Sequence, residues 1–149
     1  MKKLLSIALA LVMAMSVSVS AFATAPVDPA DSEEVIIMPR VTLFNDTAYA
    51  RRNGVWTSVE FSAAPSNGNY IRYWHKNDTG EDVRVYLYRT DGRTTTRVSS
   101  MTVKANDQNR AVYYNSTAGS GTYKIVIEAY VSGGMINGDV SAAQYKTRP

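Results

Sequence analysis

The sequence predicts an all-β protein, an antiparallel two-sheet β-sandwich of jelly-roll type with about eight strands. From Val35 onward, apolar and polar residues alternate with a period of two, and no stretch has the period of an amphipathic helix. Clusters of Gly, Asn, Asp and Ser interrupt the strand-forming residues at intervals of about ten residues. An immunoglobulin-like sandwich is the alternative, although the chain has no cysteine and lacks the Cys…Trp…Cys signature, as many such domains do.

The amino terminus has the features of a secretory signal peptide, which we assign to residues 1–23. Two lysines precede an apolar run, from Leu4 to Met15, that is too short to span a bilayer comfortably. Small residues fit cleavage after Ala23, and cleavage after Ala25 fits nearly as well. A membrane anchor is the alternative. We therefore expect a secreted, extracellular bacterial protein that has no membrane anchor after cleavage.

Residues 24–34 contain two prolines and four acidic residues, and they predict a disordered, acidic leader ahead of a single domain over residues 35–149. Removal of Lys2 and Lys3 with the signal peptide would leave 14 basic residues against 13 acidic ones. Because this balance is nearly neutral, we expect no nucleic-acid partner. The absence of cysteine excludes disulfides, thiol catalysis and cysteine-ligated zinc.

The first half of the domain is expected to contain four strands, at residues 35–44, 56–63, 70–77 and 83–90. Pro39 cannot donate to a sheet ladder, so the first strand is expected at a sheet edge, with a break or bulge at this proline. Residues 45–54 are predicted to be a loop, with a possible turn at Asn53-Gly54. The residues that alternate onto one face are Val59, Phe61 and Ala63 in the second strand and Val83, Val85 and Leu87 in the fourth.

The second half of the domain is expected to contain four more strands, at residues 98–105, 111–115, 122–131 and 139–145. Turn signals separate them, including Asp91-Gly92 and the segment "STAGSG". The residues that share a face are Met101, Val103 and Ala105 in the first of these strands and Tyr123, Ile125 and Ile127 in the third, which has the strongest pattern.

Four segments between Asp82 and Tyr145 resemble the second half of bacterial pre-peptidase C-terminal-type domains. They are "DVRVYLYRTDG", "MTVKAN", "AGSGTYKIVIEAYVSGG" and "GDVSAAQY". The same segments are similar to small secreted proteins of gut-dwelling Firmicutes. The resemblance implies a jelly-roll-like accessory domain, of a kind often attached to secreted enzymes and thought to assist targeting or binding. The matched motifs are structural, so no calcium or ligand residues carry over.

Catalytic motifs are not evident in this sequence. His75 is the only histidine, and no Gly-x-Ser-x-Gly motif supports a Ser-His-Asp triad around it. Glu60, Glu128 and Asp139 lie in or beside strands, and nothing singles out a carboxylate pair for glycoside hydrolysis. We therefore expect a protein that is not an enzyme. A secreted hydrolase with an unrecognised carboxylate pair is the alternative.

No cofactor is predicted, but one turn has the composition of a calcium site. Oxygen-bearing side chains, which suit Ca²⁺, are concentrated in "NDTGED", at Asn77, Asp78, Glu81 and Asp82. The alternative is a solvated turn in which Asn and Asp bond to their own backbone.

The strand at residues 70–77 is expected to present aromatic and basic side chains to solvent. If its even-numbered residues faced inward, Arg72 and Lys76 would be buried, which is unfavourable without partners. Ile71, Tyr73 and His75 are therefore expected in the core. The predicted ligand-binding residues are the outward side chains of this strand and of residues 83–90, namely Tyr70, Arg72, Trp74, Arg84, Tyr86 and Tyr88. These six residues form one surface only if the two strands are neighbours in one sheet.

We therefore expect a secreted, non-enzymatic binding module whose ligand is a glycan or a cell-surface protein, because aromatic faces stack on sugar rings. Tyrosine is also favoured in strands for packing reasons alone, and this accounts for the ten tyrosines without a ligand. A self-associating structural surface protein, joined through edge strands such as residues 35–44, is the second hypothesis.

Overall fold

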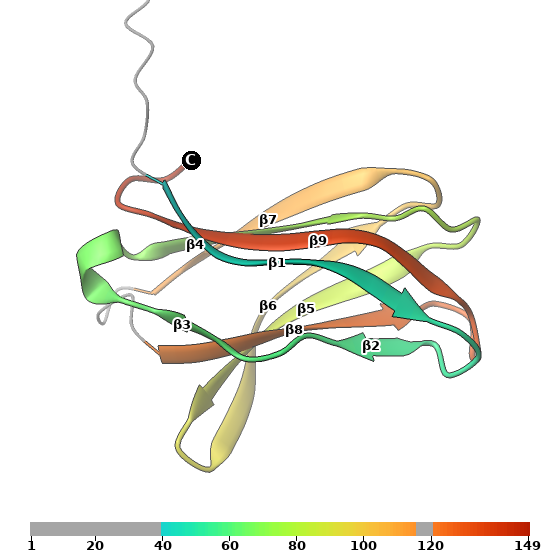
Figure 1. Ribbon diagram of the computed structural model, residues 1–149, viewed down its shortest axis with the longest axis horizontal. Coiled ribbons are helices and arrows are strands. Elements are labelled where there is room, and N and C mark those ends of the chain that lie inside the picture. The colour runs from blue at the N-terminus through green and yellow to red at the C-terminus, as the bar shows by residue number, and fades with distance from the viewer. Residues whose placement is uncertain (1–39, 116–120) are drawn as a thin grey trace, which may run out of the picture. The chain divides into compact units, whose positions relative to one another are not determined.

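The computed structural model describes residues 40–115 and 121–149, which belong to the second of the two units, residues 1–35 and 36–149, into which the chain divides. The expected signal peptide, the acidic leader, Pro39 and most of the "STAGSG" turn lie outside the described residues. The described residues form two antiparallel sheets of nine strands in all, with one 3-10 turn at Pro65–Asn67 (Figure 1). None of their helical segments is long and apolar enough to cross a membrane.

The strands divide between two sheets, here called sheet A and sheet B. Sheet A has the order β1–β9–β4–β7, with β1 at Arg40–Ala50, β9 at Ile136–Tyr145, β4 at Tyr70–Lys76 and β7 at Gln108–Tyr114. Sheet B has the order β2–β8–β5–β6, with β2 at Val55–Thr57, β8 at Gly121–Ala129, β5 at Val83–Asp91 and β6 at Thr94–Val103. The short strand β3, Phe61–Ala63, also pairs with β8.

The connections identify the sandwich as a jelly roll. The chain passes from one sheet to the other at every connection except β2–β3 and β5–β6. An immunoglobulin-like sandwich, by contrast, keeps several pairs of successive strands in the same sheet. The predicted fold class is therefore confirmed, and the jelly-roll topology is preferred over the alternative. The ninth strand arises because the expected strand at residues 56–63 is divided into β2 and β3.

The core lies between the sheets and follows the predicted alternation in the two central strands. None of the predicted core residues of β4 and β5 is more than 1% exposed, namely Ile71, Tyr73, His75, Val83, Val85 and Leu87. Aromatic rings connect the two sheets: Phe44 of β1 stacks on Phe61 at 5.4 Å between ring centroids, and Phe61 stacks on Tyr123 of β8 at 6.3 Å. Packing of this kind stabilises a small domain that has no disulfides.

The predicted loop at residues 45–54 is partly wrong, because residues 45–50 continue β1. Asn45 pairs with Ser141 and Ala50 pairs with Ile136, so the whole segment lies along β9. Asp46 accepts a hydrogen bond from the backbone N–H of Thr47 at 2.8 Å, a local bond typical of turns that here occurs within a strand. Pairing with β9 and burial of Ala48, which is fully inaccessible, outweigh the turn preference of Asn and Asp.

Val59 does not share a face with Phe61 and Ala63, contrary to the prediction. Val59 is 71% exposed, whereas Phe61 is 6% exposed. The reason is a bulge: Thr57 pairs with Val126 and Phe61 with Tyr123, so three residues lie opposite two. Ser58 closes the bulge, because its Oγ accepts from the Ile125 N–H at 2.9 Å. One extra residue reverses the alternation.

Several strand limits also differ from the predicted ones. β6, β7 and β9 begin three or four residues before the predicted positions, and β8 ends two residues earlier. The largest difference is in β6, where Thr94 pairs with Asp91 across the Asp91-Gly92 turn and extends the β5–β6 hairpin beyond the sandwich (Figure 1). Strand pairing thus begins directly after the turn rather than at the first apolar residue, Val98.

Candidate functional site

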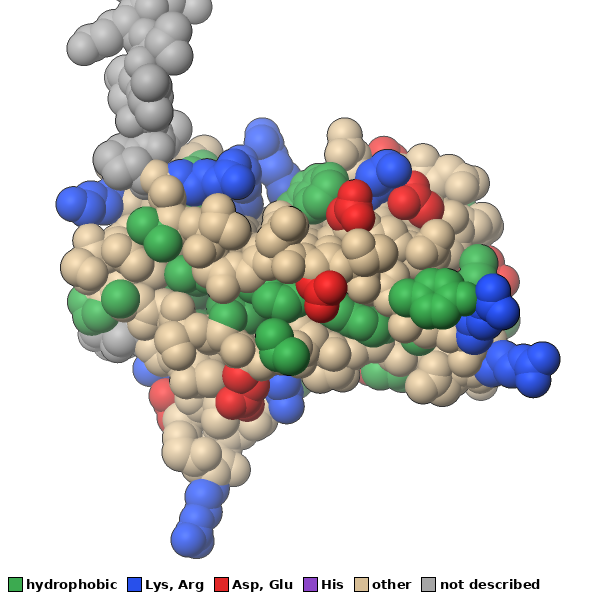
Figure 2. All heavy atoms as spheres, viewed as in Figure 1, with side chains coloured by type: hydrophobic (Ala, Val, Ile, Leu, Met, Phe, Trp, Pro, Cys, Tyr) green, Lys and Arg blue, Asp and Glu red, His purple; other side chains and the backbone are tan. Residues whose placement is uncertain are grey.

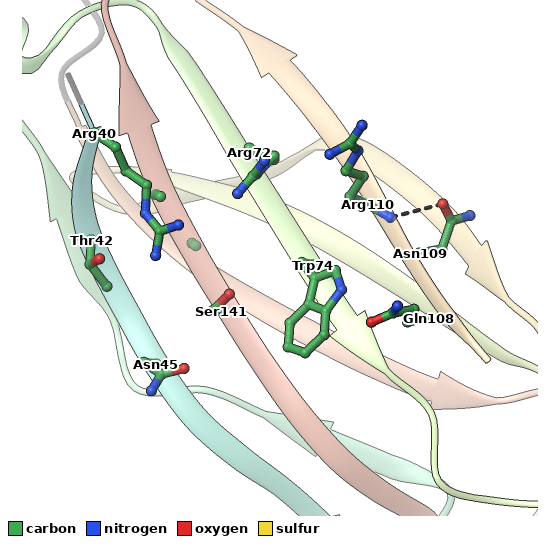
Figure 3. Close-up of a pocket in the computed structure, with 11 residues that line it drawn as sticks. Arg40, Thr42, Asn45, Arg72, Trp74, Gln108, Asn109, Arg110 and Ser141 are labelled. Atoms are coloured by element: carbon green, nitrogen blue, oxygen red, sulfur yellow. Dashed lines mark hydrogen bonds between the residues drawn. The ribbon is translucent and has the colours of Figure 1, made fainter. Parts of the chain in front are cut away.

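The outer face of sheet A carries a groove with a volume of about 640 Å³ (Figure 3). All four strands of the sheet contribute to it. The residues that line the groove are Arg40, Thr42 and Asn45 from β1, Ser141, Ala142 and Ala143 from β9, Arg72 and Trp74 from β4, and Gln108, Asn109 and Arg110 from β7.

The sequence of β9 explains why this face is hollow. Its outward residues are small at two successive positions, Ser141 and Ala143. Ser141 lies opposite Trp74 on β4, and Ala143 lies opposite Arg72. Small side chains between longer ones leave a floor with higher walls. Figure 3 shows Arg40 extending toward β9 from one side, and Trp74 extending toward it from the other.

Trp74 is half-buried and provides an aromatic wall of the groove. It pairs with Arg110 on β7, and Arg110 is exposed. Asn109 keeps this part of β7 in place: its side chain donates to the Thr102 carbonyl at 3.0 Å and accepts from the Arg110 backbone N–H at 2.8 Å, the bond drawn in Figure 3. The wall is therefore fixed by the sheet rather than by a loop.

Aromatic residues continue the face beyond the groove. Tyr70 of β4 and Tyr114 of β7 are opposite each other, with ring centroids 4.9 Å apart. The guanidinium of Arg72 lies 5.2 Å from the ring centroid of Tyr145, which is only 4% exposed. This contact positions Arg72 above the sheet by a cation–π interaction. Tyr70, Arg72 and Trp74 thus occupy one outer face, as predicted.

Arg84, Tyr86 and Tyr88 do not join this face, so the six predicted residues do not form one surface. They lie on β5 in sheet B, between β8 and β6. They lie on the outer side of sheet B, at the opposite face of the sandwich, because the chain crosses from sheet A to sheet B after β4. A single surface would require β4 and β5 to lie side by side. β5 pairs instead with β6, the strand that follows it in the sequence.

Tyr86 is also not available as a platform. It is 7% exposed, with the Arg97 guanidinium 5.2 Å from its ring centroid and the Tyr88 ring 6.2 Å away. Arg84 lies over Tyr130 at 4.2 Å, and this contact raises the pKa of Arg84 while it lowers the pKa of Tyr130. The aromatic and basic residues of sheet B therefore contact one another.

His75 faces the interior and has no place in the groove. Its Nδ1 lies 3.0 Å from the Asp139 carbonyl oxygen, and its Nε2 is buried without a hydrogen-bond partner among the residues that the structure describes. Burial lowers the pKa of His75 below its usual value, so the ring is neutral at physiological pH.

The carboxylates considered for hydrolysis lie on different segments, and none of them lines the groove. Asp139 lies on β9 of sheet A, where Thr47 Oγ1 donates to it at 3.3 Å. Glu128 lies on β8 of sheet B, and Glu60 lies between β2 and β3. These three residues do not form a pair across the groove. Elsewhere in residues 40–115 and 121–149, no cluster of three or more His, Asp or Glu side chains is arranged to hold a metal ion.

Asn77 and Asp82, in the turn at residues 77–82, form hydrogen bonds within the protein. Asn77 Oδ1 accepts from the Thr79 hydroxyl at 2.7 Å, and Asn77 Nδ2 donates to the Glu81 carbonyl at 2.7 Å. Asp82 accepts from Lys104 Nζ at 2.8 Å and from the Ala105 N–H at 3.1 Å. These bonds correspond to the alternative of a turn that satisfies its own backbone.

Sequence reasoning missed most of the groove, which includes Arg40, Arg110, Gln108 and Ser141. The alternation of residues 108–114 does place Gln108 and Arg110 on the same side as Val112. It does not reveal that β7 and β9 flank β4, because pairing between strands far apart in the sequence is set by the topology. The small outward residues of β9 indicate a hollow only once it is known that β1 and β4 flank this strand.

The chain matches no protein-family model and no curated protein. Solved structures similar to it include a mitogen from Yersinia pseudotuberculosis (16% identity, covering 76% of this chain and 92% of that chain, TM-score 0.42). A protein of the disulfide-linked pili of Bacillus endospores shares 18% identity (72% and 90% covered, TM-score 0.38). A xylan-binding domain of Paenibacillus barcinonensis Xyn10C shares 10% (75% and 99% covered, TM-score 0.41). These proteins have different roles, and likeness at this level assigns none of them to the chain.

Proposed function

We propose that this protein is a secreted, non-enzymatic binding module that holds a glycan in the groove of sheet A. The observation that carries the proposal is the position of Trp74, which is half-buried in an outward-facing groove whose floor consists of small side chains. An indole ring in this position can stack on the apolar face of a sugar ring. The floor leaves room for the ring on the side of β9.

The rest of the lining suits the hydroxyl groups of a sugar. Asn45, Gln108 and Ser141 offer amide and hydroxyl groups that both donate and accept hydrogen bonds. A volume of about 640 Å³ is within the usual range of ligand sites, roughly 300–1,000 Å³. Stacking with a few convergent polar groups is the general pattern by which a rigid site orients a small ligand.

A glycan fits the groove better than a cell-surface protein does. Protein interfaces need a wide apolar centre and bury about 800 Å² on each partner. The groove instead has one aromatic side chain among mostly polar ones. Its walls rise from β1, β4 and β7 and would keep a flat protein surface away from the floor.

Replacement of Trp74 by alanine tests the proposal. We expect Trp74→Ala to lower the affinity for glycans that the unmodified protein binds on an array by about 5- to 150-fold, because aromatic stacking is worth about 1–3 kcal/mol. Isothermal titration with the strongest hit measures the change. The thermal unfolding midpoint should stay close to that of the unmodified protein, since Trp74 is an outer-face residue.

Tyr88→Ala is the matched control, because Tyr88 is also a partly exposed aromatic residue but lies on sheet B. This variant should bind glycans as the unmodified protein does. If no glycan on the array binds, or if both variants lose affinity equally, the proposed function is wrong.

A further inference from the structure

Three arginines converge on the groove from three strands, Arg40 from β1, Arg72 from β4 and Arg110 from β7 (Figure 3). No Asp or Glu is among the residues that line the groove. The ion pairs within residues 40–115 and 121–149 are Lys76–Asp78, Arg89–Asp91 and Lys104–Asp82, so none of them involves these arginines. The groove is thus a positively charged site.

No acidic residue on or beside the strands of sheet A lines the groove, neither Asp46 of β1 and Asp139 of β9 nor Asp78 and Asp107 of the adjoining loops. Asp139 accepts a hydrogen bond from Thr47, and Asp78 is paired with Lys76 at 2.9 Å. Figure 2 shows Lys and Arg side chains gathered at one end of the surface that sheet A forms, and acidic side chains together with basic ones at the other end. Like charges gathered without partners repel one another, and this repulsion is relieved when an anion binds.

The register and the strand order set the spacing of the three arginines along the backbone. Arg72 pairs with Val112, two residues from Arg110, so Arg72 and Arg110 are diagonal neighbours, about 7–8 Å apart at Cα. Arg40 lies on the far side of β9, so two strand spacings, about 10 Å, separate β1 from β4. Trp74 stands beside them on β4. A ligand can therefore place an anionic group among the three arginines while one of its rings stacks on Trp74.

From this arrangement we propose that the ligand is an acidic glycan, whose carboxylate or sulfate groups bind Arg40, Arg72 and Arg110 while a sugar ring stacks on Trp74. The inference rests on the proposed function and adds the chemical class of the ligand. Guanidinium groups bind carboxylates and tetrahedral oxyanions through paired, charge-assisted hydrogen bonds. Arg72 is already held over Tyr145, so little of its freedom is lost on binding.

An array that carries carboxylated, sulfated and neutral glycans provides the first test. The strongest acidic hit is then titrated beside its neutral counterpart, the methyl ester for a carboxylated glycan or the desulfated form for a sulfated one. We expect the acidic form to bind at least about tenfold more tightly and its affinity to fall as salt rises. The array also shows whether carboxylate groups or sulfate groups are recognised.

The variants Arg72→Gln and Arg110→Gln should each reduce the affinity for the acidic form about tenfold, and by more than they reduce the affinity for the neutral form. Arg97→Gln is the matched control, since it removes the same charge from an exposed position on sheet B. Equal losses of affinity in all three variants would indicate that the ligand responds to the overall charge of the protein and not to the groove, and would overturn the inference.

The remaining outcomes separate the two proposals. If neutral glycans bind as tightly as acidic ones and only Trp74→Ala weakens them, the proposed function stands and the acidic ligand is wrong. If no glycan binds, both fail. A single-stranded oligonucleotide serves as a competitor of another class: binding tighter than that of the acidic glycan, and lost in Arg72→Gln, would overturn the inference in favour of nucleic acid.

Discussion

His75 and Trp74 are adjacent in the chain, and strand alternation sends their side chains to opposite sides of sheet A. His75 is completely buried, whereas Trp74 lines the groove. The histidine that attracts attention in the sequence is therefore a core residue, and its neighbour is the candidate ligand contact. Burial lowers the pKa of His75, and this has a measurable effect on stability.

We expect the protein to become less stable as the pH falls below about 6.5, the ordinary pKa of histidine. In that range the unfolded chain takes up a proton on His75, while the folded protein, in which the pKa of His75 is lowered, does not. The unfolded state is thus favoured, by no more than about 1.4 kcal/mol per pH unit, until the pH reaches the pKa of the folded state. Urea unfolding between about pH 7.5 and about pH 5.5 measures the change.

His75→Gln is the control, because glutamine does not titrate and His75 is the only histidine in the chain. Its unfolding free energy should vary less over the same range, whatever its stability at pH 7. An equal pH dependence in both proteins would show that another group is responsible.

The strands differ in how well a local pattern predicts them. β4 and β5 alternate without interruption in sequence, and the predicted inward residues of both strands are buried, although Tyr86 of β5, predicted to face outward, is buried as well. The bulge at Ser58 reverses the alternation between β2 and β3, and no feature of the sequence distinguishes Ser58 from any other serine in a strand. The extra residue is accommodated because the Ser58 hydroxyl satisfies the Ile125 N–H, a contact between segments far apart in the chain.

Two alanine substitutions test the bulge. We expect Phe61→Ala to lower the free energy of unfolding by about 3–5 kcal/mol, because Phe61 packs between Phe44 and Tyr123. Val59→Ala should change it by less than about 0.5 kcal/mol, since Val59 is exposed. Urea unfolding followed by fluorescence gives both values. A large loss of unfolding free energy for Val59→Ala would show that Val59 is buried, as an uninterrupted alternation requires, and would contradict the bulge.

Over the described part of the molecule, the sandwich leaves open edges, at β1 and β7 in sheet A and at β6 and the β2–β3 side of sheet B. The hypothesis of a self-associating surface protein depends on these edges. β1 exposes Val41 and Tyr49, 40% and 51% respectively, which favours association. It also has a register irregularity between Thr42 and Phe44 and carries charged residues at its exposed positions, features that protect natural edge strands.

We therefore expect a monomer. Sedimentation velocity from micromolar to sub-millimolar concentration should give one species with the mass of a single chain, because a bulged and charged edge pairs poorly with a second copy. A dimer or larger assembly that increases with concentration would support the structural hypothesis. Val41→Lys would then identify the strand, since a charge on β1 should abolish association through that edge.

The sequence by itself determined the fold class, most of the strands and the inward faces of β4 and β5, since alternation and turn residues are local signals with a direct physical cause. It also identified Arg72 and Trp74 as outward-facing. Only the tertiary structure decided which strands lie side by side. The crossing after β4 separates Arg84 and Tyr88 from Trp74, and the other crossings of the chain place β1, β7 and β9 in the same sheet as β4.

The groove exists because of that arrangement. Small residues of β9 form a floor only when longer side chains from β1 and β4 stand on either side, and Arg40, Arg72 and Arg110 form a charged site only when their strands share one face. Pairing between distant strands depends on the packing of the whole sandwich, so no local pattern encodes it.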